Sequence, residues 1–361
     1  MRVVAAFILG IYARGLGPVL WLERVSEEVH KVTAGGIGGR PAADRFLGTH
    51  PATWYWMAGR LPQPGAPKGR GIPMVTNGEE CGLCGGAGPI RDSHLLPASA
   101  YSLIRRPGEP IENPVWISGG DAATTSKQVT KRFLCDACET RFADRERFVM
   151  AQCNRRGRFD LLSQLVGLSP LHTERTGTRL YDLEGAQAGR WEEYAYFAAS
   201  VVWRAAATDW PTPNGVHPKQ SLGKYLEPVR RYLLGWAAFP EHVYVRLEIL
   251  GSKHLHGVTV LPKRERTRLP HAPLQHHFSI PGIFFFVVYG KMVPTFLSAT
   301  AINTPGPRVV FVGGKEESGL GDAIVRASVA AQPRGRLREW LERVRLIDSS
   351  PSSAPKRGKR P

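Results

Sequence analysis

The residues that decide the fold stand in three short stretches, Cys81-Gly82-Leu83-Cys84, Arg91-Asp92-Ser93-His94-Leu95-Leu96-Pro97 and Leu134-Cys135-Asp136-Ala137-Cys138-Glu139. Four of the five cysteines form two CxxC pairs, which flank a lone histidine in a short apolar run. A CxxC turn supplies two thiolates from one backbone hairpin, and two such turns complete the tetrahedral shell of a structural zinc ion. The spacing therefore predicts a Zn²⁺ site on Cys81, Cys84, Cys135 and Cys138.

The composition indicates a globular chain with a strong positive charge. Of 361 residues, 42% are hydrophobic, and 48 Lys and Arg exceed 31 Asp and Glu to give a net charge of +17. Such an excess favours a polyanionic partner, and we expect nucleic acid, DNA in particular, rather than a membrane. A genome-wide preference for arginine is the alternative, because it would raise the charge without any binding role.

Cysteine usage indicates a reducing compartment. In a chain without a convincing export signal, CxxC pairs are metal ligands rather than a disulfide framework. The apolar run from Val3 to Tyr12 has the shape of a signal-peptide core, but it is far shorter than the roughly 18–20 residues that cross a bilayer. We therefore expect a cytoplasmic protein. Cys153 lies outside the pairs and is expected to be a lone thiol.

The chain divides into four predicted segments. Residues 1–73 contain glycine repeats and Pro/Gly-rich spacers, and they are expected to form a poorly ordered or weakly packed extension. Residues 74–155 form the cysteine unit, residues 156–348 a larger α+β domain of unknown role, and residues 349–361 a disordered basic tail. A true translation start at Met74 is a hypothesis that follows from the first boundary.

Local patterns predict the elements within these segments. A helix over Val19 to Val32 is the one element expected in the first segment, and Arg105 to Ser126 is expected to be a loop because prolines and glycines interrupt it. Apolar residues at helical or alternating spacing predict helices over 139–150, 159–166, 191–205, 222–233 and 337–347, and strands over 243–250, 258–261, 283–289 and 309–312.

One CxxC turn, an extended segment with Ser93-His94-Leu95-Leu96-Pro97 and a helix that begins at the second CxxC are typical of a treble clef. On these motifs, residues 81–146 resemble the HNH endonucleases, which commonly pair two CxxC turns with an Asp-His-hydrophobic-hydrophobic-Pro strand. The predicted fold class is α+β, with a treble-clef zinc unit (ββα) followed by a larger domain of helices and antiparallel sheet. The resemblance implies a metal-dependent nuclease that hydrolyses phosphodiester bonds of nucleic acid.

The resemblance also implies the residues of a catalytic site. His94 takes the place of the histidine that acts as general base on the attacking water. Ser93 stands where the family usually has a metal-ligating aspartate, and Glu139 where it has a metal-ligating histidine or asparagine. Thr130 lies near the position of an asparagine that orients the base. Three of the four positions therefore depart from the family pattern.

Nearby carboxylates offer replacements for the missing ligands. Glu139 is itself a good ligand for Mg²⁺ or Mn²⁺. Asp92 shares a strand face with His94 by the two-residue period and is expected to replace the missing aspartate. Glu146, two helical turns after Glu139, is a further candidate acid. The alternative is a non-catalytic, zinc-stabilised module that binds nucleic acid or protein, in which His94 only supports the half-buried strand.

Signals outside the cysteine unit are weaker. Trp203 either stacks on a base or packs against the zinc unit, and packing is the expected role. Basic groups either track a phosphate backbone or form a solvated face; they are Arg230-Arg231, Lys263-Arg264, Arg266 and Arg268. The histidines of the second half are expected on the surface without a metal; they are His254, His256, His271, His276 and His277.

Overall fold

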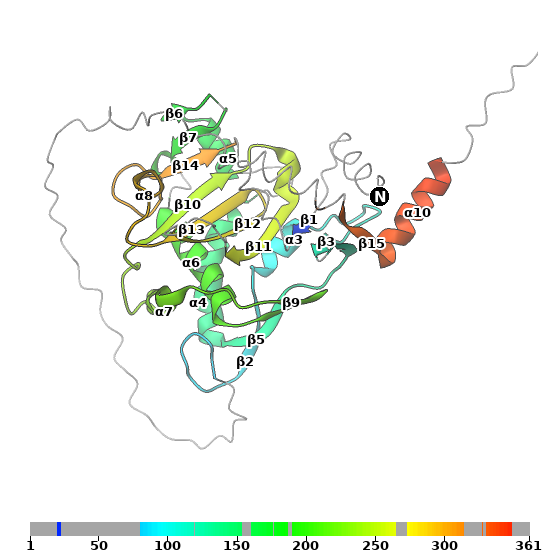
Figure 1. Ribbon diagram of the computed structural model, residues 1–361, viewed down its shortest axis with the longest axis horizontal. Helices are drawn as coiled ribbons and strands as arrows, with labels where there is room; N and C mark the ends of the chain where they lie inside the picture. Colours follow the sequence, from blue (N-terminus) through cyan, green and yellow to red (C-terminus); the bar gives the residue numbers. More distant parts are fainter. Residues whose placement is uncertain are drawn as a thin grey trace, which may run out of the picture.

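A mixed sheet of eleven strands forms the centre of the structure (Figure 1). This computed structural model describes residues 20–22, 80–118, 120–153, 160–175, 177–186, 190–264, 273–313, 327 and 330–348. In spatial order the strands are β15 (Gln332–Arg334), β4 (Asp121–Thr124), β3 (Val115–Ser118), β1 (Leu20–Leu22), β11 (Val258–Arg264), β12 (Leu274–Ile280), β13 (Ile283–Tyr289), β10 (Val243–Ile249), β14 (Val309–Val312), β7 (Arg179–Asp182) and β6 (His172–Thr173).

Two hairpins and a set of helices complete the described part. One is β8 (Trp210–Thr212) with β9 (Gly215–His217), and the other is the antiparallel pair of β2 (Ile90–His94) with β5 (Thr130–Cys135), which we call the β2–β5 hairpin although other elements separate its strands in sequence. None of the described helices is long and apolar enough to cross a bilayer. They are α3 (Ala98–Leu103), α4 (Asp136–Ala151), α5 (Asp160–Val166), α6 (Trp191–Ala207), α7 (Leu226–Leu233), α8 (Thr295–Ala299) and α10 (Gly335–Asp348), with 3₁₀ turns η2 (Leu183–Gly185), η3 (Gly223–Tyr225) and η4 (Lys253–Gly257).

The middle of the sheet follows the sequence pattern closely. β11, β12, β13 and β10 are antiparallel neighbours, and each residue of β10 pairs with one of β13. Their β-branched and aromatic residues suit a pleated surface, with Val245, Leu247 and Ile249 buried in the core. The predicted strands over 283–289 and 309–312 are confirmed, and so is the mixed α+β class. Other pairings are parallel, however: β1 is parallel to both β11 and β3, β15 is parallel to β4, and β14 is parallel to β10 although antiparallel to β7.

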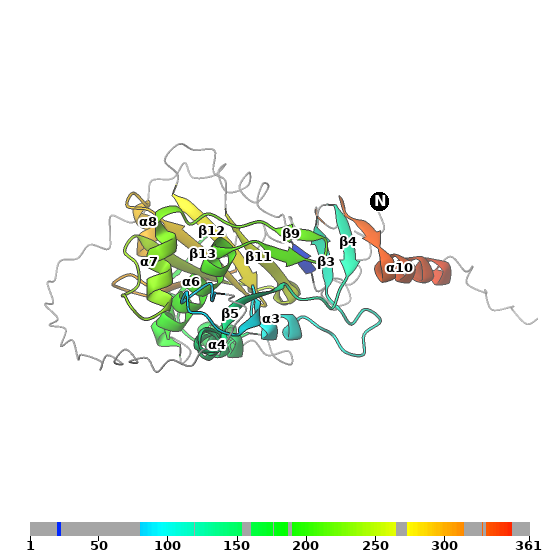
Figure 2. The same ribbon diagram turned by 90° about the horizontal axis from the view of Figure 1, so that it is seen from below.

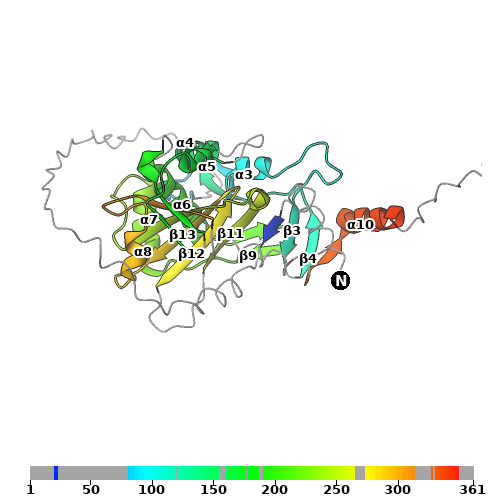
Figure 3. The same cartoon turned by 90° about the horizontal axis from the view of Figure 1, so that it is seen from above.

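Helix α6 lies between the large sheet and helix α4 (Figures 2 and 3). On the sheet side, the ring centroid of Phe197 lies 5.3 Å from that of Phe285. On the other side, Trp203 stacks on Phe133 of β5 at 5.6 Å, which confirms packing as its role. The predicted amphipathic helix is therefore buried on both sides, because the β2–β5 hairpin and α4 cover the face opposite the sheet.

A buried arginine joins α6 to this hairpin and to α4. The Arg204 side chain is 2% exposed and forms an ion pair with Glu146 of α4. Its Nη1 also donates a hydrogen bond of 2.7 Å to the backbone oxygen of His94. Glu146, predicted as a further candidate acid, is thus the partner of a buried cation. Separating α6 from α4 would leave one buried charge without its partner, which is costly.

Two predictions for the N-terminal half are wrong. The interval from Arg105 to Ser126 contains β3 and β4 rather than a continuous loop, and these strands belong to the large sheet although they lie between the two CxxC turns in sequence. Leu20–Leu22, within the helix predicted over Val19 to Val32, is strand β1 between β3 and β11. The rest of the extension, Met74 and the basic tail lie outside the described residues.

The prediction of surface histidines is also wrong for three of the five. His256 is buried, and its Nε2 lies 2.6 Å from the backbone oxygen of Leu250. His276 and His277 are buried in β12, a strand that the sequence pattern did not indicate. Burial, with the charge of Arg264, lowers the pKa of His276 to about 3. His271 and the side chain of His254 lie outside the described residues.

We expect Arg204→Ala to lower the free energy of unfolding by about 3–5 kcal/mol, because Glu146 would keep a poorly solvated charge without a partner. Urea denaturation of the purified protein measures this change. Replacing both partners, Arg204→Met with Glu146→Leu, should recover most of the loss. Arg338→Ala is the matched control, since it breaks an exposed pair with Glu342 and should change little. Equal stability of Arg204→Ala and Arg338→Ala would contradict the assignment.

We expect His276 to make the fold sensitive to mild acid. Its pKa is about 3 in the folded chain, against an ordinary value of 6.5, so the unfolded chain binds the proton more tightly. The stabilisation is complete above pH 6.5 and is lost as the pH falls from there toward 3, by roughly 1–2 kcal/mol between pH 7 and pH 5. Denaturation across this range should show a shallower pH dependence for His276→Leu than for the wild type, and parallel curves would contradict it.

Candidate metal centre

The first CxxC pair lies on a tight turn, the knuckle, formed by residues 81–86. Cys81 N–H donates to the Gly86 oxygen at 3.0 Å, and Gly85 N–H donates to the Cys81 oxygen at 2.8 Å. Gly85 has a φ of 72°, the left-handed region in which glycine is favoured. Gly82 N–H bonds to the oxygen of Phe133, and a Cβ on Gly82 would clash with the Phe133 ring. Glycine at these two positions therefore permits the knuckle to close against β5.

The second CxxC pair lies where a strand turns directly into a helix. Cys135 is the last residue of β5 and the residue that precedes α4, and Cys138 lies in the first helical turn. Strand β2 leaves the knuckle and pairs antiparallel with β5, from Ile90 opposite Cys135 to His94 opposite Thr130. The hairpin therefore brings the knuckle and the start of α4 together.

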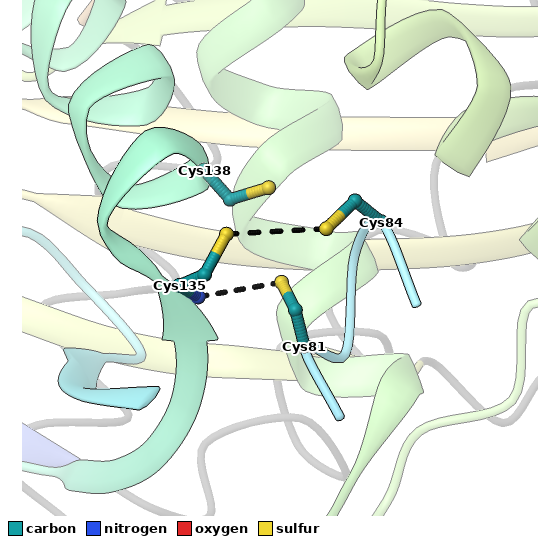
Figure 4. Close-up of side chains that lie close together, drawn as sticks. All are labelled: Cys81, Cys84, Cys135 and Cys138. Atoms are coloured by element: carbon teal, nitrogen blue, oxygen red, sulfur yellow. Dashed lines mark hydrogen bonds between the residues drawn. The ribbon is translucent and has the colours of Figure 1, made fainter. Parts of the chain in front are cut away.

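The four cysteine sulfurs form one cluster (Figure 4). All four Sγ atoms lie within 4.8 Å of one another, and the sulfurs of Cys84 and Cys135 are 3.9 Å apart. Tetrahedral zinc with Zn–S bonds of about 2.3 Å requires sulfurs about 3.8 Å apart. The predicted ligand set Cys81, Cys84, Cys135 and Cys138 is thus confirmed as a group that could hold a metal, and its donor chemistry suits a soft or borderline ion.

Backbone amides supply part of the electrostatics of the cluster. Cys135 N–H points to the sulfur of Cys81 at 3.3 Å, and Gly86 N–H to that of Cys84 at 3.4 Å. Burial raises the pKa of Cys81, but hydrogen bonds from backbone amides outweigh it and lower this pKa to about 7. Burial and the charge of Cys81 raise the pKa of Cys138. Four thiolates at this distance repel one another, and a bound cation removes that repulsion.

Residues of the predicted catalytic group lie on two sides of β2. Ser93 is fully buried, and its Oγ accepts a hydrogen bond of 3.0 Å from Leu134 N–H. Ser93 therefore holds β2 and β5 together from their buried side. Asp92 is exposed, and His94 is half-buried with its ring centroid 6.2 Å from that of Tyr101.

Glu139 lies in the first turn of α4, one residue after Cys138, and is half-buried. Its Oε1 is buried without a hydrogen-bond partner. Within the described ranges, the four cysteines are the one cluster of at least three His, Cys, Asp or Glu side chains that could hold a metal. Asp92, His94 and Glu139 are not brought together as such a cluster. Mg²⁺ commonly takes only one or two carboxylates from the protein, with waters and substrate phosphates as its other ligands.

Two arginines hold the backbone of the cysteine unit, and local sequence patterns do not predict these contacts. Arg204 holds the His94 backbone oxygen, although the two residues are 110 positions apart. Arg230 of α7 donates from Nη1 to the oxygen of Leu83 in the knuckle at 2.6 Å. The sequence marks Arg230 only as part of a basic pair, with a solvated or phosphate-binding role. Only the tertiary structure shows that it contacts the cysteine unit.

No family model matches the chain, and neither a curated protein nor a solved structure is significantly similar to it.

We expect Cys135→Ser to abolish stoichiometric metal binding and to lower the melting temperature, because one ligand and the link between the knuckle and α4 are lost together. Metal content by plasma mass spectrometry and thermal unfolding measure the two effects. Cys153→Ala is the matched control: its thiol is buried outside the cluster, so the variant should keep its metal. Full metal content in Cys135→Ser would contradict the four-cysteine site.

Proposed function

We propose that residues 81–146 form a treble-clef zinc unit of the HNH type and that the protein is a metal-dependent nuclease acting on DNA. The observation that supports this proposal is the position of His94 and Glu139 on β2 and α4, two elements next to the cysteine cluster. His94 ends β2, and Glu139 follows the second CxxC pair in α4. The net charge of +17 supports a polyanionic substrate.

His94 is the proposed general base. Its backbone is held by the hairpin and by Arg204, so the ring has a defined position beside Tyr101. The imidazole takes a proton from water as the water oxygen attacks the phosphorus, the bond to the leaving oxygen breaks, and that oxygen receives a proton. A Mg²⁺ or Mn²⁺ ion, when bound by Glu139 and Asp92, would stabilise the charge that develops on the phosphate. Zinc on the four cysteines is structural in this scheme.

A non-catalytic nucleic-acid-binding module is the second candidate. The burial of Ser93 favours it, because this position supplies a metal-ligating aspartate in the nucleases that the sequence resembles. In that case the zinc unit and the basic surface would bind nucleic acid, and His94 would only complete the hairpin. The two candidates agree on binding and differ on hydrolysis.

We expect the protein to cleave plasmid DNA in the presence of Mg²⁺ or Mn²⁺, and His94→Ala to lower the rate by roughly 100-fold or more, as the loss of a general base does. Gel electrophoresis measures the rate, and zinc content confirms the folded unit in each variant. His172→Ala, at an exposed histidine on β6, is the matched control and should retain the wild-type rate. Binding without cleavage, or equal cleavage by His94→Ala, would favour the second candidate.

A further inference from the structure

An exposed tryptophan follows helix α7 beside the knuckle. Trp236 is 60% exposed, an uncommon state for so large an apolar ring. Its backbone is nevertheless fixed by the helix end: Trp236 N–H donates to the Arg231 oxygen at 2.9 Å, and Gly235 N–H donates to the Tyr232 oxygen at 2.8 Å. Gly235 has a φ of 75°, which completes a Schellman cap. The indole is thus presented to solvent from a rigid position.

Arg230 lies beside this indole and connects it to the knuckle. The guanidinium carbon of Arg230 lies 5.6 Å from the Trp236 ring centroid. The same guanidinium donates to the Leu83 oxygen in the knuckle and, at 2.7 and 3.0 Å, to the carboxylate of Glu227. Arg230 is therefore held on three sides, and the exposed part of the indole remains available to a second planar group.

The surroundings of Trp236 suit a ring that carries a phosphate. Arg231 on α7 and Arg141 on α4 are exposed, and Nη1 of Arg141 donates at 2.8 Å to the backbone oxygen of Leu234, two residues before Trp236. The adjoining acid Glu227 is neutralised by Arg230. The local charge that remains is positive, which favours an anion close to the ring.

A small pocket adjoins this surface. It has a volume of about 280 Å³ between α7 and the segment that follows Trp236, with Pro228 and Phe239 among its apolar lining residues. Its charged lining residues are Arg231, Glu227 and Glu241. Because Glu227 is paired with Arg230, the remaining charges of the lining are Arg231 and Glu241, and the Glu241 carboxylate can accept hydrogen bonds from donors on the edge of an uncharged ring. A nucleobase has these properties.

We propose that Trp236, Arg230, Arg231 and Arg141, the Trp236 surface, bind single-stranded nucleic acid by stacking an unpaired base on the indole. Within a duplex the faces of the bases are covered by their neighbours, so away from its two ends only an unpaired base offers a free face to the ring. The inference deepens the proposed function, on which it rests, because it names the form of nucleic acid recognised. The Arg230–Leu83 contact places this surface against the same cysteine unit that carries His94.

Fluorescence anisotropy with labelled oligo(dT) of about 12 nucleotides, within the range of known single-strand sites, tests the inference at low salt. A blunt DNA duplex of equal length is the comparison. We expect Trp236→Ala to weaken oligo(dT) binding by roughly 5- to 150-fold, as expected for one lost base stack, and to change duplex binding much less. Trp236→Phe, which keeps an aromatic face, should recover most of the affinity.

Phe296→Ala is the matched control, because Phe296 on α8 is 61% exposed and lies outside the Trp236 surface. Zinc content and the melting temperature of each variant exclude misfolding. Unchanged oligo(dT) affinity in Trp236→Ala, an equal loss in Phe296→Ala, or the absence of oligo(dT) binding by the wild type would overturn the inference, even if the protein cleaves duplex DNA. Trp236-dependent binding without any hydrolysis would support the inference and count against the nuclease.

Discussion

Four cysteine sulfurs within 4.8 Å of one another are the constraint on which the unit around them depends. Cys84 and Cys135 are 51 positions apart, so the cluster closes a long loop at a considerable entropic cost. Backbone amides stabilise the thiolate of Cys81, but they do not offset the repulsion among four thiolates. A cation bound there would both close this loop and relieve the repulsion between the sulfurs. The positions of the knuckle, the β2–β5 hairpin and the start of α4 all depend on this cysteine cluster.

Arg204 links the cysteine unit to helix α6 and so to the large sheet. It pairs with Glu146, bonds to the His94 backbone and lies over the Phe142 ring at 5.2 Å, while its own helix packs on the large sheet. A buried ion pair of this kind adds little net stability compared with an apolar contact, but it is costly to break. The Arg204–Glu146 pair therefore mainly fixes the position of α6 relative to α4. The cysteine unit is fixed to α6 in one orientation and is not a module on a flexible linker.

The sequence predicted those features that depend on residues close together in the chain. The CxxC spacing identified the four cysteines of the cluster, alternation identified β10, and a strand-length apolar run identified β13. Features that depend on long-range contacts could not be predicted. The prolines and glycines around β3 and β4 indicate a loop, but these residues form strands because β3 pairs with β1 and β4 pairs with β3. His276 was placed on the surface because a histidine alone carries no sign of burial. Arg204 gave no local signal, since its partners are on other elements.

The local geometry of β2 explains why a serine suits position 93 better than an aspartate. Ser93 points into the core and bonds to Leu134 N–H, and an ionised carboxylate at this depth would be desolvated. The pairing of β2 with β5 shifts between Arg91 and Asp92, which face Leu134 and Arg132, so the extra residue of the bulge is Phe133 on β5. Asp92, two residues before His94 on β2, is exposed to solvent. In the proposed nuclease, Asp92 and Glu139 would be the two protein ligands, and substrate phosphate and water would complete the shell of a Mg²⁺ ion. That cation would thus assemble with its substrate, whereas the four cysteines could hold a structural ion by themselves.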